Sequence, residues 1–278
     1  MNILKDFFKK NNSNITIEEP TPHKLFPLVI YENKVSCHEE TKKTLLENYE
    51  REKFPVIEKK DLPLNDGSVI KDGLTTETFT GEGHGLATLH KKPYYKKFYT
   101  ELLQHAYAYM RMLGLRTDNV DIYVMKSWLV IHEDYNHTIP FHVHPESNIS
   151  FVYYTQTTEF SQSILFENAL NQNELSQDIF NVNLLDVQKD DKMLVEPNEY
   201  NTNVHQLHVK EGMILMFPGW RTRHGTNSVL NSDHFPSNEE TPVPRLAIAG
   251  DLKIVLRPDR LSTMTLCSSL DHWHKLND

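Results

Sequence analysis

The spacing of hydrophobic residues changes along the chain, from a helical period to short strand-like runs. Residues 93–113 carry apolar side chains at every third or fourth position, which predicts one amphipathic helix packed against a sheet. A shorter helix is predicted over residues 36–53, because Ser36 and Glu39 have the spacing of a capping box. The early part of the chain is therefore expected to be helical and irregular.

After residue 120, runs of β-branched and aromatic residues alternate with segments rich in turn-forming residues, a pattern typical of strands. An earlier run of the same kind covers residues 25–31. The later predicted strands cover residues 122–131, 149–156, 163–166, 213–217 and 245–256. Few helices followed by many strands predict an α+β fold, mainly β, with a jelly-roll or sandwich core.

We expect residues 1–278 to form a single domain with three parts. Residues 1–120 would form the helical and irregular N-terminal part, residues 121–256 the jelly-roll core, and residues 257–278 a C-terminal tail. The sequence shows no internal repeat and no linker that would divide the chain further.

Composition and charge exclude several classes of protein. The net charge of -9 and the pI near 5.9 give no overall attraction to nucleic acid or to an anionic membrane. No apolar run approaches the roughly 20 residues of a membrane span, and the N-terminus lacks a signal-peptide pattern. The two cysteines lie far apart and indicate neither a disulfide framework nor a thiolate zinc site, so we expect a cytoplasmic, reducing setting.

The candidate chemistry lies in two histidine-containing stretches that are distant in the sequence. Residues 141–155, FHVHPESNISFVYYT, place His142 and His144 two positions apart, so both rings would point to one face of an extended strand. Residues 213–227, MILMFPGWRTRHGTN, add His224 after an apolar run. Fifteen histidines produce such pairs by chance, so the spacing counts only together with this strand context. Two near imidazoles and one distant imidazole indicate a metal site in a β-barrel.

These two stretches resemble the motifs of a family of 2-oxoglutarate/Fe(II) oxygenases common in phages and marine bacteria. The first is similar to the pattern H-x-H-P-x-S-x-x-S-G-x-Y-Y, and the second to G-x-L-L-x-F-P-x-W-x-x-H with one additional residue before the histidine. The resemblance extends over residues 127–254. It implies a double-stranded β-helix fold and the cofactors Fe(II), 2-oxoglutarate and O₂, with hydroxylation of a C–H bond and release of succinate and CO₂.

By this resemblance, His142, His144 and His224 are the metal ligands and the catalytic centre. Three ligands on one side of an iron ion leave positions for the oxoacid and O₂. A second ligand set stays open, because facial triads usually contain a carboxylate and Glu146 lies two residues after His144. Pro145 stands between them and argues against that set, because a proline there should end the strand.

Oxoacid binding also needs a cation for the distal carboxylate of 2-oxoglutarate. Arg245 is the candidate, because it opens the last predicted strand and a guanidinium can bind a carboxylate through two hydrogen bonds. Tyr154 and Asn227 are further candidates for oxoacid binding, and Trp220 is a candidate for the wall of the substrate pocket. For each of these three residues, a purely structural role is an equal alternative to a role in the site.

The sequence departs from the family pattern on the strands that would hold the oxoacid. Phe151 stands where the pattern has glycine. Ala247, Gly250 and Asp251 stand where the pattern has serine, phenylalanine and asparagine. These departures make the oxoacid site less secure than the metal site.

Two other functions are compatible with the same residues. A cupin-like metalloenzyme would use three histidines without an oxoacid, and a non-catalytic jelly-roll module would bind or support other molecules with no chemistry at the histidines. The polar segments 167–207 and 228–244 are expected to frame the pocket mouth, and the acidity of the first disfavours a polyanionic substrate. A small metabolite or a peptide side chain fits better, and no nucleic-acid or membrane partner is expected.

Overall fold

The structure is a computed structural model that describes ten segments of the chain. They are residues 28–49, 62–63, 69–70, 74–75, 88–132, 138–158, 161–168, 202, 204–226 and 243–257. The helices in these segments are α2 (His38–Glu47) and α4 (Lys96–Met112), with short 3-10 helices at Leu89–Lys91, Pro93–Tyr95 and Thr117–Asn119. The strands are β1 (Tyr31–Lys34), β2 (Leu62–Pro63), β3 (Val69–Ile70), β4 (Leu74–Thr75), β5 (Val120–His132), β6 (Ile149–Gln156), β7 (Ile164–Glu167), β8 (Val204–Leu207), β9 (Met213–Phe217), β10 (His224–Thr226) and β11 (Arg245–Leu256).

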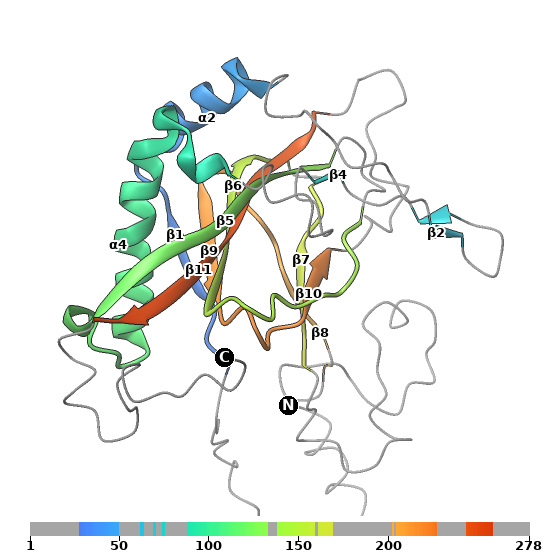
Figure 1. The fold of residues 1–278 in the computed structure, drawn as a ribbon. Helices are drawn as coiled ribbons and strands as arrows, with labels where there is room; N and C mark the ends of the chain where they lie inside the picture. Colours follow the sequence, from blue (N-terminus) through green and yellow to red (C-terminus); the bar gives the residue numbers. More distant parts are fainter. Residues whose placement is uncertain are drawn as a thin grey trace, which may run out of the picture.

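The main sheet contains six strands in the order β1-β9-β6-β11-β5-β4, and every pairing is antiparallel. A second antiparallel sheet contains β10, β7 and β8 in that order. Figure 1 shows α4 along one side of the main sheet and the smaller sheet on the other. Two antiparallel sheets that face each other confirm the predicted mainly β, jelly-roll fold with supporting helices.

Strict alternation along the central strands separates two hydrophobic clusters. On the helix side, Phe98 and Leu102 of α4 pack with Ile131, Tyr153 and Ile248 of the sheet. On the side of the smaller sheet, the packed residues are Trp128, Val130, Tyr154, Ile164, Phe166, Met213, Leu215, Phe217, Ala247 and Ala249. Successive residues of one strand point to opposite faces, so each central strand contributes to both clusters.

The predicted helix over residues 93–113 is confirmed. Pro93 opens a short 3-10 turn, α4 follows from Lys96 to Met112, and Gly114 ends it with a φ of +78°. A residue in this left-handed region is normally glycine, because a side chain there meets the backbone.

The predicted capping box at α2 is wrong. The N-cap is Cys37, with no side-chain cap, and the carboxylate of Glu101 on α4 accepts hydrogen bonds from the backbone N–H groups of Ser36 and Cys37. A partner 64 residues away therefore replaces the local cap. The helix ends at Glu47, and residues 50–53 of the prediction lie outside the described residues.

The central strands begin and end close to the predicted residues, whereas the first strand is displaced. β6, β9 and β11 have the predicted bounds, and β5 and β7 differ by at most two residues at either end. The first strand is Tyr31–Lys34 rather than 25–31, and residues 25–27 lie outside the described part. Most of the polar segments 167–207 and 228–244, and the tail after residue 257, also lie outside it. Within the described residues, the helices are too short or too polar to cross a membrane.

Candidate active site

The two histidine stretches meet in space although 82 positions separate His142 from His224. The two residues form an antiparallel bridge in which the N–H of each donates to the carbonyl oxygen of the other, at 2.9 Å and 3.0 Å. The N–H of His144 donates to the carbonyl oxygen of Gly219 at 3.0 Å. Backbone hydrogen bonds thus fix all three histidines relative to one another.

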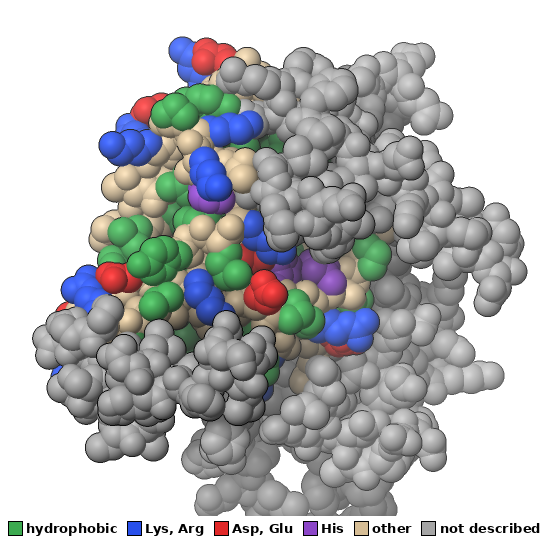
Figure 2. Space-filling model, viewed as in Figure 1, with side chains coloured by type: hydrophobic (Ala, Val, Ile, Leu, Met, Phe, Trp, Pro, Cys, Tyr) green, Lys and Arg blue, Asp and Glu red, His purple; other side chains and the backbone are tan. Residues whose placement is uncertain are grey.

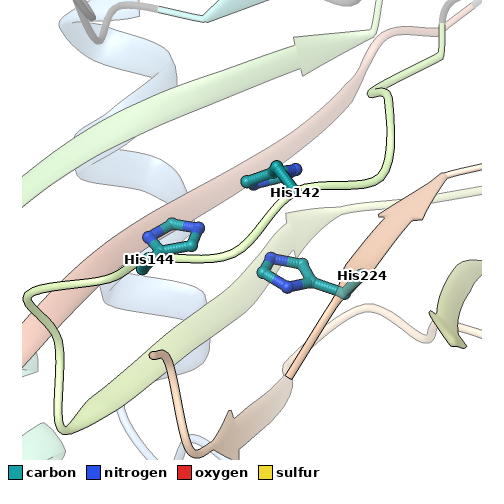
Figure 3. Close-up of side chains that lie close together, drawn as sticks. All are labelled: His142, His144 and His224. Carbon is teal, nitrogen blue, oxygen red and sulfur yellow. The ribbon is translucent and has the colours of Figure 1, made fainter. Parts of the chain in front are cut away.

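The three imidazoles converge on one point (Figure 3). Their ring centroids are 5.0 Å apart for His142 and His144, 4.4 Å for His142 and His224, and 5.2 Å for His144 and His224. One nitrogen from each ring lies within 4.8 Å of the other two. This is the only group of this kind among the residues that the structure describes, and three convergent imidazoles are a set of ligands suited to a transition metal.

Hydrogen bonds determine which nitrogen of each ring faces the centre. The Nδ1 atoms of His142 and His224 lie 2.8 Å and 2.9 Å from the carbonyl oxygens of Pro140 and Thr222. A carbonyl oxygen only accepts, so each Nδ1 carries the proton and each Nε2 keeps a free lone pair. The Nε2 of His144 is buried and has no hydrogen-bond partner among the described residues. The lone pairs are therefore available to a cation.

The third histidine has a different partner. The Nδ1 of His144 donates to the Oδ2 of Asp251 at 2.9 Å, and Asp251 is only 1% exposed. The hydroxyl of Ser150 donates to its Oδ1 at 2.6 Å, and the ammonium of Lys126 lies 3.4 Å from Oδ2. Burial raises the pKa of Asp251, but His144, Ser150 and Lys126 outweigh it and hold that pKa below its usual value.

Burial keeps the imidazoles of His142 and His224 neutral. It lowers the pKa of His224 to about 3, with further contributions from the neighbouring His142 and His144. It also lowers the pKa of His142. Around neutral pH these rings are therefore ready to donate lone pairs without first losing a proton.

A cavity of about 260 Å³ extends from the histidines to Arg245. Most of its wall is apolar, with Trp128, Val130, Ile164, Phe217, Ala247 and Ala249 among its lining residues. Arg245 is 4% exposed, and its guanidinium lies 4.9 Å from the centroid of the Tyr154 ring. Figure 2 shows histidine atoms open to the surface near the middle of one face, and His142 is the partly exposed member of the cluster.

The polar groups at the Arg245 end are unsatisfied. Nε and Nη1 of Arg245 and the hydroxyl of Tyr154 are buried without hydrogen-bond partners in the described part of the chain. Burial lowers the pKa of Arg245 and raises that of Tyr154, and the proximity of the two groups opposes both shifts without outweighing burial. Buried polar groups normally have partners, so unpaired donors in a cavity indicate a site for an acceptor.

The other candidate residues have different positions. Glu146 is exposed and is not in the histidine cluster; its backbone carbonyl accepts a hydrogen bond from Lys253. Trp220 is 56% exposed and does not line the cavity, so it is not part of the pocket wall. Asn227 lies outside the described residues.

Two departures from the family pattern lie opposite each other. Phe151 on β6 is directly opposite Gly250 on β11. A Cβ atom on Gly250 would lie 2.5 Å from the Phe151 ring. The pattern has glycine on the first strand and phenylalanine on the second, so the two residue types are exchanged between neighbouring strands in this chain.

The sequence shows Asp251 only as a departure from the family pattern and does not indicate its contact with His144. The signal was its spacing from Arg245: Arg245, Ala247, Ala249 and Asp251 alternate along one strand and share a face. That face was known to carry the candidate arginine. The sequence alone does not reveal that Asp251 contacts His144, because the two residues are 107 positions apart.

Solved structures of several oxygenases are similar to this chain at low sequence identity. A prolyl-4-hydroxylase from Pseudomonas putida is 10% identical, with 81% of this chain and 92% of that chain covered and a TM-score of 0.43. A prolyl hydroxylase from Trichoplax adhaerens, in complex with a hypoxia inducible factor peptide, is 12% identical, with 85% and 87% covered and a TM-score of 0.43. HygX from Streptomyces hygroscopicus, with nickel and 2-oxoglutarate bound, is 10% identical, with 81% and 82% covered and a TM-score of 0.42.

The sequence matches a family model over the region that carries the three histidines. No curated protein matches the chain. Residues 126–234 match the family described as "Putative 2OG-Fe(II) oxygenase", and they include all three clustered histidines. This match confirms the resemblance found in the motifs and the predicted cofactors, which are Fe(II), 2-oxoglutarate and O₂. The match covers 109 of the 278 residues, so the chain is similar to the 2OG-Fe(II) oxygenases over the part that carries the three histidines.

Proposed function

We propose that this protein is a 2OG-Fe(II) oxygenase that hydroxylates a C–H bond of its substrate, with His142, His144 and His224 as the iron ligands. The observation that carries the proposal is one cavity with imidazole lone pairs at one end and, at the other, a buried guanidinium for which the described residues offer Nε and Nη1 no hydrogen-bond partner. A metal ion and a dicarboxylate are the two ligands that satisfy these groups together.

The residues fit the metal. The buried Nε2 of His144 has no hydrogen-bond partner among the described residues, and the protons of His142 and His224 are held on the opposite ring nitrogens by carbonyl oxygens. Neutral imidazole is a common ligand of iron. Glu146 would have to leave the surface to join this set, so the three-histidine set is preferred to one with that carboxylate.

The residues also fit the oxoacid. Arg245 would bind the distal carboxylate of 2-oxoglutarate, and the unpaired hydroxyl of Tyr154 would donate to the same group. Ala247, which replaces the serine of the family pattern, lines the cavity without offering a donor. Tyr154 then supplies the neutral hydrogen bond at this end.

When bound together, Fe(II) and 2-oxoglutarate supply oxidative chemistry with O₂ that yields succinate and CO₂. The protein's contribution is positioning and exclusion of water. The backbone bridge between His142 and His224 fixes the ligand side, and the apolar wall keeps the cavity dry. The partly exposed side of His142 is the side from which a substrate would enter.

The size and lining of the cavity support a small substrate group. A space of about 260 Å³ that also has to hold the oxoacid leaves room for a small group only. A small molecule, or one side chain of a peptide, fits that space. A metalloenzyme without an oxoacid would have no use for a buried unpaired arginine, so that alternative is less favoured.

The test is an anaerobic titration of the apo-protein with Fe(II) and then 2-oxoglutarate, followed by the visible charge-transfer band of the chelated oxoacid. The expected result is a band that saturates at one equivalent in the unaltered protein. It should be lost in His224→Ala and require far more oxoacid in Arg245→Met. Arg257→Met is the matched control, because Arg257 pairs with Asp121 at the surface and does not line the cavity.

Two outcomes would contradict the proposal. Iron binding without the band would leave a metalloenzyme that does not use an oxoacid. Equal behaviour of Arg245→Met and Arg257→Met would remove Arg245 from the site. Once the band is established, release of succinate with candidate small molecules and peptides identifies the substrate.

A further inference from the structure

The three histidines differ in the group that receives the proton of Nδ1. For His142 and His224 the acceptor is a neutral backbone carbonyl, whereas for His144 it is the buried carboxylate of Asp251. A hydrogen bond to a charged carboxylate is stronger than one to a neutral carbonyl. One of the three rings is therefore held and polarised differently from the other two.

The carboxylate itself is fixed from several sides. Asp251 is opposite Ser150 in the β6–β11 pair and opposite Lys126 in the β5–β11 pair, and both side chains contact it. The strand register shifts directly after Asp251, and a bulge of this kind often re-aims a side chain near a site. Gly219 supports the arrangement, because a Cβ there would lie 2.4 Å from the hydroxyl of Ser150.

His144 is also fixed from its flat side. The ring of Trp128 stacks on it, with centroids 5.8 Å apart and an interplanar angle of 16°. The ammonium of Lys126 lies 5.1 Å from the centroid of the same Trp128 ring. Stacking on Trp128 restricts the tilt of the imidazole, and the hydrogen bond to Asp251 restricts its rotation. Together they fix the direction of Nε2.

We infer that Asp251 is the positioning residue of the metal site, which orients His144 and supplies the negative charge that a set of three neutral imidazoles lacks. The inference rests on the proposed function, because it assumes that His144 binds the metal. A carboxylate behind a ligating histidine fixes its tautomer and makes it a stronger donor. In the usual facial triad a carboxylate binds the metal directly, whereas here the carboxylate of Asp251 would act through the imidazole of His144.

The experiment is a calorimetric titration of the apo-protein with Co(II), together with the visible spectrum of the bound ion. Co(II) is the probe because its spectrum reports the donor strength of the ligands and it binds without O₂ chemistry. Asp251→Asn keeps an acceptor for Nδ1 and removes the charge, whereas Asp251→Ala removes both. Asp121→Asn is the matched control, because Asp121 is at the surface and pairs with Arg257.

We expect Asp251→Asn to weaken Co(II) binding by about 10-fold and Asp251→Ala by about 100-fold. The Co(II) spectrum should shift in Asp251→Asn and stay unchanged in Asp121→Asn. Should Asp251→Ala fail to fold, Ser150→Ala gives the second test: it leaves the charge but frees one oxygen, and a smaller weakening is expected.

The possible failures are distinguishable. If the unaltered protein binds no stoichiometric metal, the proposed function and this inference are both overturned. If it binds metal, and Asp251→Asn and Asp251→Ala match it in affinity and spectrum, the inference alone is overturned. A loss in Asp251→Ala that Asp251→Asn restores in full would assign Asp251 to orientation only and overturn its role as a source of charge.

Discussion

The two faces of the six-stranded sheet are made by the same strands but carry different kinds of residue. On β11, the side chains toward the helices are Leu246, Ile248 and Leu252, and those toward the cavity are Arg245, Ala247, Ala249 and Asp251. On this strand the helix face carries large apolar groups, whereas the cavity face combines small residues with buried polar ones. The apolar residues of β11 stabilise the fold, and its small and polar residues provide the capacity to bind.

The two kinds of residue contribute differently to the free energy of unfolding. Large apolar side chains on the helix face stabilise the fold through burial, at about 1.5–3 kcal/mol for each. Unpaired polar groups on the cavity face cost stability until a ligand satisfies them. Changes to the two faces should therefore alter different measurements, and the following predictions run from the largest expected effect to the smallest.

The helix face should be most sensitive at the pair formed by Phe151 and Gly250. Phe151→Gly should lower the free energy of unfolding by about 3–5 kcal/mol, because it leaves a cavity beside Phe98. Gly250→Phe should lower it by about 3 kcal/mol, because the new Cβ meets the Phe151 ring. Urea unfolding of both single variants and the double variant measures the coupling.

The double variant should lose about 2 kcal/mol less than the sum of the two single losses, because the ring no longer opposes the new side chain. Rescue should remain partial, since a Cβ on Gly250 also lies 2.7 Å from the carbonyl oxygen of Lys126, which the exchange does not move. Strict additivity would refute the compensation between β6 and β11.

On the cavity face, a substitution at Arg245 should raise the free energy of unfolding of the apo-protein rather than lower it. Arg245→Met removes an unpaired buried charge and keeps a similar length, so the apo-protein should gain about 1–2 kcal/mol in the free energy of unfolding while it loses oxoacid affinity. The urea midpoint without ligand measures the first effect. A lower midpoint would mean that the guanidinium has a stabilising role in the empty fold.

The attachment of α2 to α4 should depend on pH through Glu101. Burial opposes its ionisation, but the backbone N–H groups of Ser36 and Cys37 donate to it and lower its pKa to about 2. The folded pKa lies below the unfolded value, so the contribution is complete above the unfolded pKa, near 4.5, and is lost as the pH falls toward 2. Glu101→Gln should therefore cost about 1 kcal/mol at pH 7 and progressively less in acid.

Thermal unfolding of Glu101→Gln between pH 3 and pH 7 tests this dependence. Glu40→Gln is the control, because Glu40 forms an exposed pair with Lys97 and should contribute little at any pH. Metal binding should be unchanged in both variants, because neither residue lies on the cavity face. A cost for Glu101→Gln that does not vary with pH would contradict the assigned cause.

The sequence was sufficient where a feature depends on local alternation. The bounds of β6, β9 and β11 follow from runs of apolar residues, and the convergence of His142 and His144 follows from their spacing on an extended segment. The third histidine required the family pattern, because nothing local joins residue 224 to residue 142.

The sequence was insufficient where a distant partner decides the outcome. Ser36 and Glu39 have the spacing of a cap, yet Glu101 from α4 takes the N–H groups. Gly250 and Phe151 appeared as two separate departures from the pattern until the strand pairing set them opposite each other. The same pairing set Asp251 opposite Ser150. In each case the missing information was which strand or helix lies beside which.

Strand β11 sets the separation between two groups of the site. Arg245 and Asp251 stand six residues apart on it, so roughly 20 Å of extended backbone separates the group proposed for the oxoacid from the group behind His144. Because β5 and β6 pair with β11 on both sides, neither end can slide alone. Deletion of one residue between them would turn one of the two side chains toward the helices, so the length of this interval is as much a requirement of the site as the identity of its residues.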